Sequence, residues 1–164
     1  MNAPVGFTLH KLTGSSLANL DLTADIFDSI REDYPEFDAW FKNTVVNDLD
    51  NRLGLAFVAE STGAVAGIAL IKVIEDVLPT AGWGEMSKLS TFKIADDYLG
   101  LSLGQTLLDE VFRCLEKTKQ DNVFVEVFPK HKQLLTFLES NTFFRGPVLT
   151  ERGEVCLSRN LCPF

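Results

Sequence analysis

The stretch KLSTFKIADDYLGLSLGQTLL, residues 88–108, predicts a strand that runs through a tight turn at Gly100 directly into an amphipathic helix. Beyond the turn, apolar residues recur at helical spacing, at Leu107, Leu108, Val111, Phe112 and Leu115. Gly104 lies on the same face one turn earlier. The segment from residue 101 to about residue 119 is therefore the clearest helix in the sequence.

This strand, turn and helix favour an anion site. The first turn of a helix has unpaired backbone N–H groups and the positive end of the helix dipole. A glycine at the turn lets the chain approach a phosphate where a side chain would block it, so a pyrophosphate would fit. The alternative is that Gly100 and Gly104 serve only a tight turn and close helix packing.

Before this stretch, the sequence predicts a short strand, two helices and a hairpin. The strand is Phe7–Leu12, with Gly14, Ser15 and Ser16 as a turn after it. Thr23 can cap a first helix that Pro35 stops, and a second helix runs from about residue 36 to Asp50, with Phe37, Trp40, Phe41, Thr44 and Val45 on one side. The hairpin pairs 55–60 with 64–74, and a third extended segment, 84–94, follows it.

After the clearest helix come further strands and a helix. NVFVEVF, residues 122–128, is short and almost wholly apolar, which is typical of a strand covered on both faces, and it implies a parallel crossover. A helix near residues 130–140 would bury Leu134, Leu135 and Leu138, and two terminal strands are predicted at 143–150 and 154–161. This order predicts a mixed α/β sheet.

Composition restricts the classes of protein. The chain has 164 residues, 46% of them hydrophobic and 23% charged, which predicts one compact domain over residues 1–164. Its net charge of -8 argues against nucleic acid as a partner. The first residues lack a basic leader, and no apolar run is long enough to span a membrane, so we expect a cytoplasmic protein with no membrane partner. Three cysteines and two histidines favour no metal site.

The order of elements and the loop resemble the GNAT superfamily of N-acetyltransferases over nearly the entire chain. The coenzyme loop of that family typically reads Arg or Gln, two residues, Gly, one residue, Gly or Ala. Here Gly100 is retained and Gly104 matches the last glycine, whereas Leu99 stands at the Arg or Gln position and Ser102 at the central Gly position. The residues in the family act mostly through backbone N–H groups, so these two departures leave the donors in place.

The resemblance implies a mostly antiparallel sheet of about seven strands with a splayed parallel pair, four helices, and acetyl-CoA as the coenzyme. The loop would bind the pyrophosphate through Leu99, Gly100, Leu101, Ser102, Leu103, Gly104 and Gln105. Phe92, Lys93 and Ile94 would pair their backbone with the pantetheine arm. His131 would either touch the coenzyme or cap the fourth helix.

The implied reaction is direct attack of a primary amine on the acetyl thioester, for which a base is desirable because the amine must arrive neutral. Glu126, the sole charge in NVFVEVF, is the first candidate base; the alternative is a carboxylate paired with a lysine at the sheet surface. Glu85 is the second candidate, or else a solvated carboxylate at a strand end. Lys88 stands where several relatives carry the base and is the third candidate catalytic residue; the alternatives are that it holds a substrate carboxylate or points to solvent.

Other positions of the family pattern also differ. Leu138 stands where relatives often have the Tyr that protonates the leaving thiolate, and Thr142 replaces a Gly. An acidic run at residues 28–38 would attract cationic amines or form a solvated face.

The leading hypothesis from the sequence is an acetyl-CoA-dependent N-acetyltransferase, monomeric or homodimeric, acting on an amine of a small molecule, peptide or protein. Two alternatives are a catalytically inactive GNAT-like module that binds acyl-CoA or a partner, and an interaction domain with no such ligand.

Overall fold

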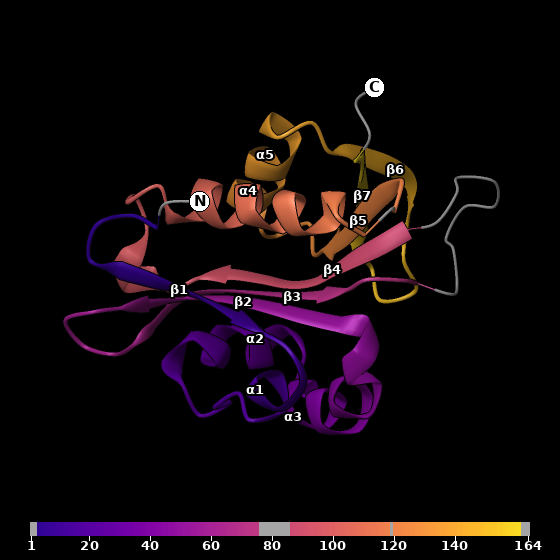
Figure 1. The fold of residues 1–164 in the computed structure, drawn as a ribbon. Helices are drawn as coiled ribbons and strands as arrows, with labels where there is room; N and C mark the ends of the chain where they lie inside the picture. Colours follow the sequence, from indigo (N-terminus) through magenta and orange to yellow (C-terminus); the bar gives the residue numbers. More distant parts are fainter. Residues whose placement is uncertain (1–2, 76–85, 119, 162–164) are drawn as a thin grey trace. The chain divides into compact units, whose positions relative to one another are not determined.

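The computed structural model describes residues 3–75, 86–118 and 120–161. Its strands form a seven-stranded sheet in which hydrogen-bonded neighbours follow the order β1-β2-β3-β4-β5-β7-β6 (Figure 1). The strands are β1 (Phe7–Leu12), β2 (Arg52–Ala59), β3 (Val65–Lys72), β4 (Met86–Ile94), β5 (Asn122–Val127), β6 (Phe144–Leu149) and β7 (Val155–Asn160). The β4–β5 pair is parallel, whereas β1–β2, β5–β7 and β6–β7 are antiparallel. The predicted mixed α/β sheet is confirmed.

The α-helices are α1 (Gly14–Ala18), α2 (Asp28–Asp33), α3 (Phe37–Trp40), α4 (Leu103–Glu116) and α5 (Lys132–Ser140). Short segments of other helical types are η1 (Asp25–Phe27), η2 (Phe41–Val45), η3 (Val46–Asn51) and η4 (Asp96–Tyr98). The prediction of four helices was therefore too low, because α1 occupies the segment expected to be a turn. The Thr13 amide donates to Ser16 Oγ at 2.9 Å, and Leu17 is fully buried, so a capped start and one apolar anchor stabilise this short helix.

The chain divides into two compact units, one of Met1–Ile71 with Thr91–Arg113 and the other of Lys72–Ser90 with Cys114–Phe164. Strand β4 contributes to both, with Met86–Ser90 in the second unit and Thr91–Ile94 in the first. The single domain expected over residues 1–164 stays a prediction.

In the first unit, β1 pairs with β2 from Phe7↔Ala59 to Leu12↔Gly54. Helices α1, α2 and α3 lie together on one face of β1, β2 and β3 (Figure 1). Phe37 stacks on Phe27 with ring centroids 5.5 Å apart, and both rings are buried. The apolar core on this face comprises Leu17, Leu22, Ile26, Phe27, Phe37, Phe41, Val45, Ala56, Ile68 and Leu70.

The long helix predicted for residues 36–50 is broken. Helix α3 passes into the π-helical η2 and then into the 3-10 segment η3, which has a non-helical residue at Asp48 (φ −138°, ψ 31°). The apolar spacing was read correctly, since Phe37, Phe41 and Val45 are all buried, although Thr44 is exposed. These side chains are thus buried as the spacing predicts, even though the backbone that carries them is not a regular α-helix.

The helix expected to be capped by Thr23 also begins differently. The Thr23 hydroxyl donates to Asp21 Oδ1 at 2.6 Å and its amide donates to the same oxygen at 3.0 Å, while helical structure starts at Asp25. Both hydrogen bonds lower the pKa of the Asp21 carboxyl, and the bond from the hydroxyl has the larger effect. Thr23 therefore closes a turn with Asp21, because an Asp side chain competes well for nearby backbone and hydroxyl donors.

In the second unit, β5 pairs with β7 from Asn122↔Asn160 to Val127↔Val155. Helix α5 buries Leu135 and Leu138, as predicted, but Leu134 is only half-buried. Strand β6 pairs with β7 with a register shift between Arg145 and Leu149, and every residue of β6 is exposed. Residues 76–85, which include most of the loop between β3 and β4, lie outside the described residues.

Candidate functional site

The turn between β4 and α4 is held in place within the first unit. The Ala95 amide donates to Ala66 O at 2.9 Å, and the Tyr98 ring meets the Phe7 ring edge-on with centroids 5.6 Å apart. The Tyr98 hydroxyl also lies 3.3 Å from Thr62 Oγ1. Segment η4 is therefore fixed on β1 and on the β2–β3 turn, so the loop that follows it starts from a defined position.

Close packing of β3 fixes the end of β4. A Cβ added at Gly67 would lie 2.9 Å from Ile94 Cδ1 and 3.5 Å from Leu107 Cδ2. A side chain at this position would push the flexible end of Ile94 aside, so β3 packs closely against Ile94 at this glycine. The sequence analysis missed this glycine, because its role depends on which strand packs against it.

The loop between Leu99 and Leu103 is exposed and has open space around Gly100. Gly100 has a φ of +81° and Ser102 a φ of +62°, and a Cβ added at Gly100 would meet nothing within 4 Å. Leu99 and Leu101 are 58% and 53% exposed. Across the parts of the chain that the structure describes, no hydrogen bond engages the amides of Gly100, Leu101 or Ser102. These donors therefore stay available to an anion.

The rest of the loop begins α4. Leu103 is buried and Gly104 half-buried, and the Thr106 amide donates to Ser102 O at 3.2 Å, which is the first bond of the helical type. The Gln105 side chain donates to Asp109 Oδ1 at 2.9 Å, within the helix. The loop thus offers backbone amides and the positive end of a helix dipole, as the sequence predicted, and this donor set fits a diphosphate.

Strands β4 and β5 pair over a short length only. Their parallel register runs from Met86↔Asn122 to Lys88↔Phe124. β4 continues to Ile94 and β5 to Val127, and these described residues add no further β4–β5 pair. The two strands therefore part after Lys88, which is the splayed pair that the sequence led us to expect.

The backbone segment expected to meet the pantetheine arm forms the last part of β4. Phe92, Lys93 and Ile94 are all half-buried, and Lys93 Nζ lies 3.7 Å from Asp96 Oδ1. Their role toward a coenzyme stays a prediction.

Lys88 and Glu126 meet where the strands part. Lys88 Nζ lies 2.6 Å from Glu126 Oε1, and the two side chains are 28% and 22% exposed. The register explains the contact: Lys88 is opposite Phe124, and Glu126 is two residues further along the same face of β5. Lys88 Nζ also lies 5.6 Å from the centroid of the Phe124 ring. The lysine thus points at the candidate base rather than away from the protein.

Two of the three candidate catalytic residues are thereby brought together, and the contact matches the alternative interpretation of Glu126 as a carboxylate paired with a lysine. Glu85, the third candidate, lies outside the described residues. A paired carboxylate can still accept a proton, but an incoming amine must first displace the lysine ammonium from it.

Cys156 is a neighbour of this pair that sequence reasoning missed. It lies directly opposite Glu126 in the β5–β7 register and is half-buried. Burial raises the pKa of its thiol, the negative charges of Glu126 and Glu154 raise it further, and Lys88 acts in the opposite direction. No sequence motif marks this cysteine, because only the strand register places it beside Glu126.

The charge of Glu126 should be measurable through Cys156. Because a raised pKa lowers the thiolate fraction, we expect iodoacetamide to alkylate Cys156 more slowly at mildly alkaline pH than it alkylates an unperturbed cysteine. Glu126→Gln removes a cause of the upward shift, so the pKa should fall and alkylation at fixed pH should become faster. Peptide mass spectrometry over time gives the rate at Cys156 alone. An unchanged rate in Glu126→Gln would contradict this coupling.

His131 lies at the N-terminal cap position of α5, in agreement with the interpretation that placed it at the start of this helix. It is half-buried, its amide donates to Phe128 O at 3.0 Å, and its carbonyl accepts from the Leu135 amide at 3.1 Å. Its backbone thus links the end of β5 to the first turn of α5. A contact between His131 and the coenzyme stays a prediction.

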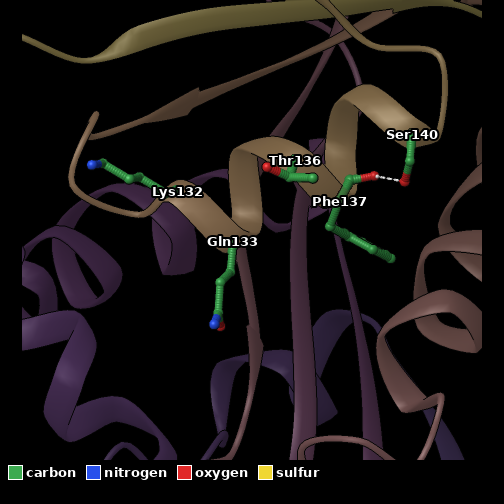
Figure 2. A pocket seen from close by; sticks show the side chains of 5 residues that line it. All are labelled: Lys132, Gln133, Thr136, Phe137 and Ser140. Atoms are coloured by element: carbon green, nitrogen blue, oxygen red, sulfur yellow. Dashed lines mark hydrogen bonds between the residues drawn. The ribbon is translucent and has the colours of Figure 1, made fainter.

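The outer side of α5 borders a shallow, open hollow of about 380 Å³ (Figure 2). Gln133 and Phe137 point to the same side of the helix, whereas Lys132 points away from them, and Ser140 Oγ donates to Phe137 O at 2.7 Å. All five lining residues, Lys132, Gln133, Thr136, Phe137 and Ser140, come from this one helix. Such a hollow lacks the converging polar groups of a built site.

The acidic run at residues 28–38 is partly neutralised within the first unit. Arg31 pairs with Asp28 at 3.1 Å and with Asp38 at 2.9 Å, and it also donates to Leu22 O. Arg31 thus neutralises part of this charge within the fold. Among the described residues, no His, Cys, Asp and Glu side chains form a group of three or more placed to hold a metal ion. Within the same parts of the chain, no helix has the length and apolar character of a membrane span.

Comparison with known proteins identifies the fold. No family model matches the sequence, and no curated protein matches it. Among solved structures, an acetyltransferase of the GNAT family from Staphylococcus aureus Mu50 has a TM-score of 0.69 and 15% identity, covering 94% of this chain and 99% of that one. The PaiA N-acetyltransferase from Thermoplasma acidophilum has a TM-score of 0.68 and 17% identity, covering 94% and 98%.

The ribosomal-protein-S18-alanine N-acetyltransferase from Escherichia coli is also similar, with a TM-score of 0.62 and 18% identity over 94% of each chain. The chain therefore has the fold of the GNAT acetyltransferases, as its sequence led us to expect.

Proposed function

We propose that the chain is an acetyl-CoA-dependent N-acetyltransferase that transfers an acetyl group to a primary amine. The observation that carries this proposal is the loop at Gly100, whose free amides precede α4 in a chain with the GNAT fold. The Thermoplasma neighbour was solved in complex with coenzyme A, which supports the same ligand here.

The loop would bind the diphosphate through the amides of Gly100, Leu101 and Ser102 and through the first turn of α4. Because such donors are already in place before the ligand binds, little conformational entropy would be lost on binding. Acetyl-CoA, when bound, supplies an acetyl thioester ready for attack by an amine.

Glu126 would act as the base that takes a proton from the acceptor ammonium. The Glu126 side chain is 22% exposed and lies beside the place where the strands part, so an amine that displaces the Lys88 ammonium would reach the carboxylate there. Leu138 is fully buried and offers no acid. A thiol with an ordinary pKa of about 8.5 is a tolerable leaving group, so transfer does not depend on an acid at that position. Orientation of the amine supplies much of the rate.

A second function is favoured by the ion pair itself. Because Lys88 already engages Glu126 at 2.6 Å, the site would be closed to an external amine if the pair did not open. The protein would then be a GNAT-like module that binds acyl-CoA without catalysis.

Calorimetry and turnover together separate these functions. We expect coenzyme A and acetyl-CoA to bind in isothermal titration at physiological salt. We also expect thiol release from acetyl-CoA when α-amino compounds, alkyl diamines and lysine peptides are supplied as acceptors. Binding with no thiol release from any acceptor would favour the module, and absence of binding would refute both functions.

A further inference from the structure

Lys88 places a primary amine of the protein itself on the candidate base. Its Nζ is 2.6 Å from Glu126 Oε1, at the last residue of β4 that pairs with β5. The side chain is 28% exposed, so it is paired with the carboxylate without being closed off from solvent. For Lys88 to reach this carboxylate, no external amine has to diffuse in and displace another group.

We propose that Lys88 is a self-acetylation site, which the protein modifies with acetyl-CoA before it acts on an external amine. This inference rests on the proposed function, because it uses the same thioester and the same base. Lys88 would be the first amine to be acetylated because its ammonium already lies beside Glu126, where the ammonium of an external acceptor would have to bind.

The chemistry balances without any further reactant. Glu126 takes a proton from the Lys88 ammonium, and the freed lone pair of Nζ attacks the carbonyl carbon of the acetyl thioester. The new C–N bond forms and the C–S bond breaks. The nitrogen loses a second proton, the sulfur leaves with a proton as coenzyme A thiol, and Glu126 returns its own proton to solvent.

The modification would change the charge at the site. An acetylated lysine is a neutral amide, so it loses both the ion pair with Glu126 and the cation–π contact with Phe124. The Glu126 carboxylate is then released to receive an external ammonium. Self-acetylation would thus convert the closed pair into a site with an available base.

Lys72 is a matched comparison within the same unit. Its Nζ lies 3.2 Å from Glu75 Oε1, and the two side chains are 18% and 15% exposed. It is therefore an ion-paired, partly buried lysine like Lys88, but it lies on β3 and not where β4 leaves β5. Ordinary chemical acetylation by a thioester should favour neither lysine strongly.

The test uses the purified full chain with acetyl-CoA and no added amine. Acetylation of Lys88 blocks trypsin there and leaves a peptide of residues 73–93, which mass spectrometry quantifies over time. We expect Lys88 to be modified about a hundredfold faster than Lys72, with a stoichiometric burst of thiol. Glu126→Gln should abolish the preference for Lys88, whereas Glu75→Gln should leave it intact. Lys88→Arg should remove the burst and keep coenzyme binding.

If the protein binds coenzyme A and acetylates an external amine, three results would overturn self-acetylation and leave the proposed function standing. These are equal rates at Lys88 and Lys72, a preference for Lys88 that survives Glu126→Gln in a variant with unchanged circular dichroism, and a burst that survives Lys88→Arg. Absence of coenzyme binding in calorimetry would instead refute the proposed function, and self-acetylation with it.

Discussion

Replacing Gly100 by Trp is expected to weaken coenzyme A binding by about a hundredfold or more, because the indole would fill the space in front of the loop amides. A Cβ at Gly100 meets nothing within 4 Å, so the larger side chain would project outward without a clash inside the protein. Isothermal titration with coenzyme A and acetyl-CoA measures the loss.

The control is Gly153→Trp, in the turn between β6 and β7. Gly153 has a φ of +87°, against +81° for Gly100, and a Cβ there also meets nothing within 4 Å. Both variants therefore carry a similar backbone strain, of about 1 to 2 kcal/mol. Affinity should be lost in Gly100→Trp and retained in Gly153→Trp. Equal affinity in the two variants would place the diphosphate elsewhere.

Glu126→Gln is expected to lower the turnover of acetyl-CoA with an external amine by about a hundredfold to ten-thousandfold, the usual contribution of a general base. Gln keeps the size of the side chain but does not take the proton, so coenzyme binding should stay close to that of the native chain. Initial rates of thiol release at saturating acetyl-CoA measure the effect, and calorimetry measures the binding.

Glu110→Gln is the matched control for this loss. Glu110 pairs with Arg113 at 3.1 Å and its side chain is 14% exposed, so it is also an ion-paired, partly buried carboxylate. If the two variants lost equal activity, the effect would follow from a damaged fold rather than from a missing base. A Glu126→Gln variant with full turnover would show that this carboxylate serves the ion pair alone.

The sequence predicted most of the fold because burial leaves a clear periodic pattern. The stripe of Leu107, Leu108, Val111 and Leu115 predicted α4, and each of these residues is fully buried. The break in the helix after α3 could not be foreseen. The buried residues Phe37, Phe41 and Val45 keep a spacing of four that an unbroken helix would also show.

The site could be predicted only where it depends on local backbone. Gly100 marks the loop because its positive φ and open surroundings belong to the turn itself. The contact of Lys88 with Glu126 depends instead on the register between β4 and β5, and the position of Cys156 on that between β5 and β7. The sequence predicts the strands but not the register in which each one pairs with its neighbour.

Strand β6 ends the sheet order, and its sequence disfavours the pairing of its outer edge with another chain. Phe144 and Val148 are 74% and 75% exposed, which would invite another chain to pair there. Pro147 has no N–H to donate, however, and the register shift between Arg145 and Leu149 interrupts the regular row of donors and acceptors. The outermost strand is thus a poor template for growth of the sheet into fibrils, despite its apolar surface.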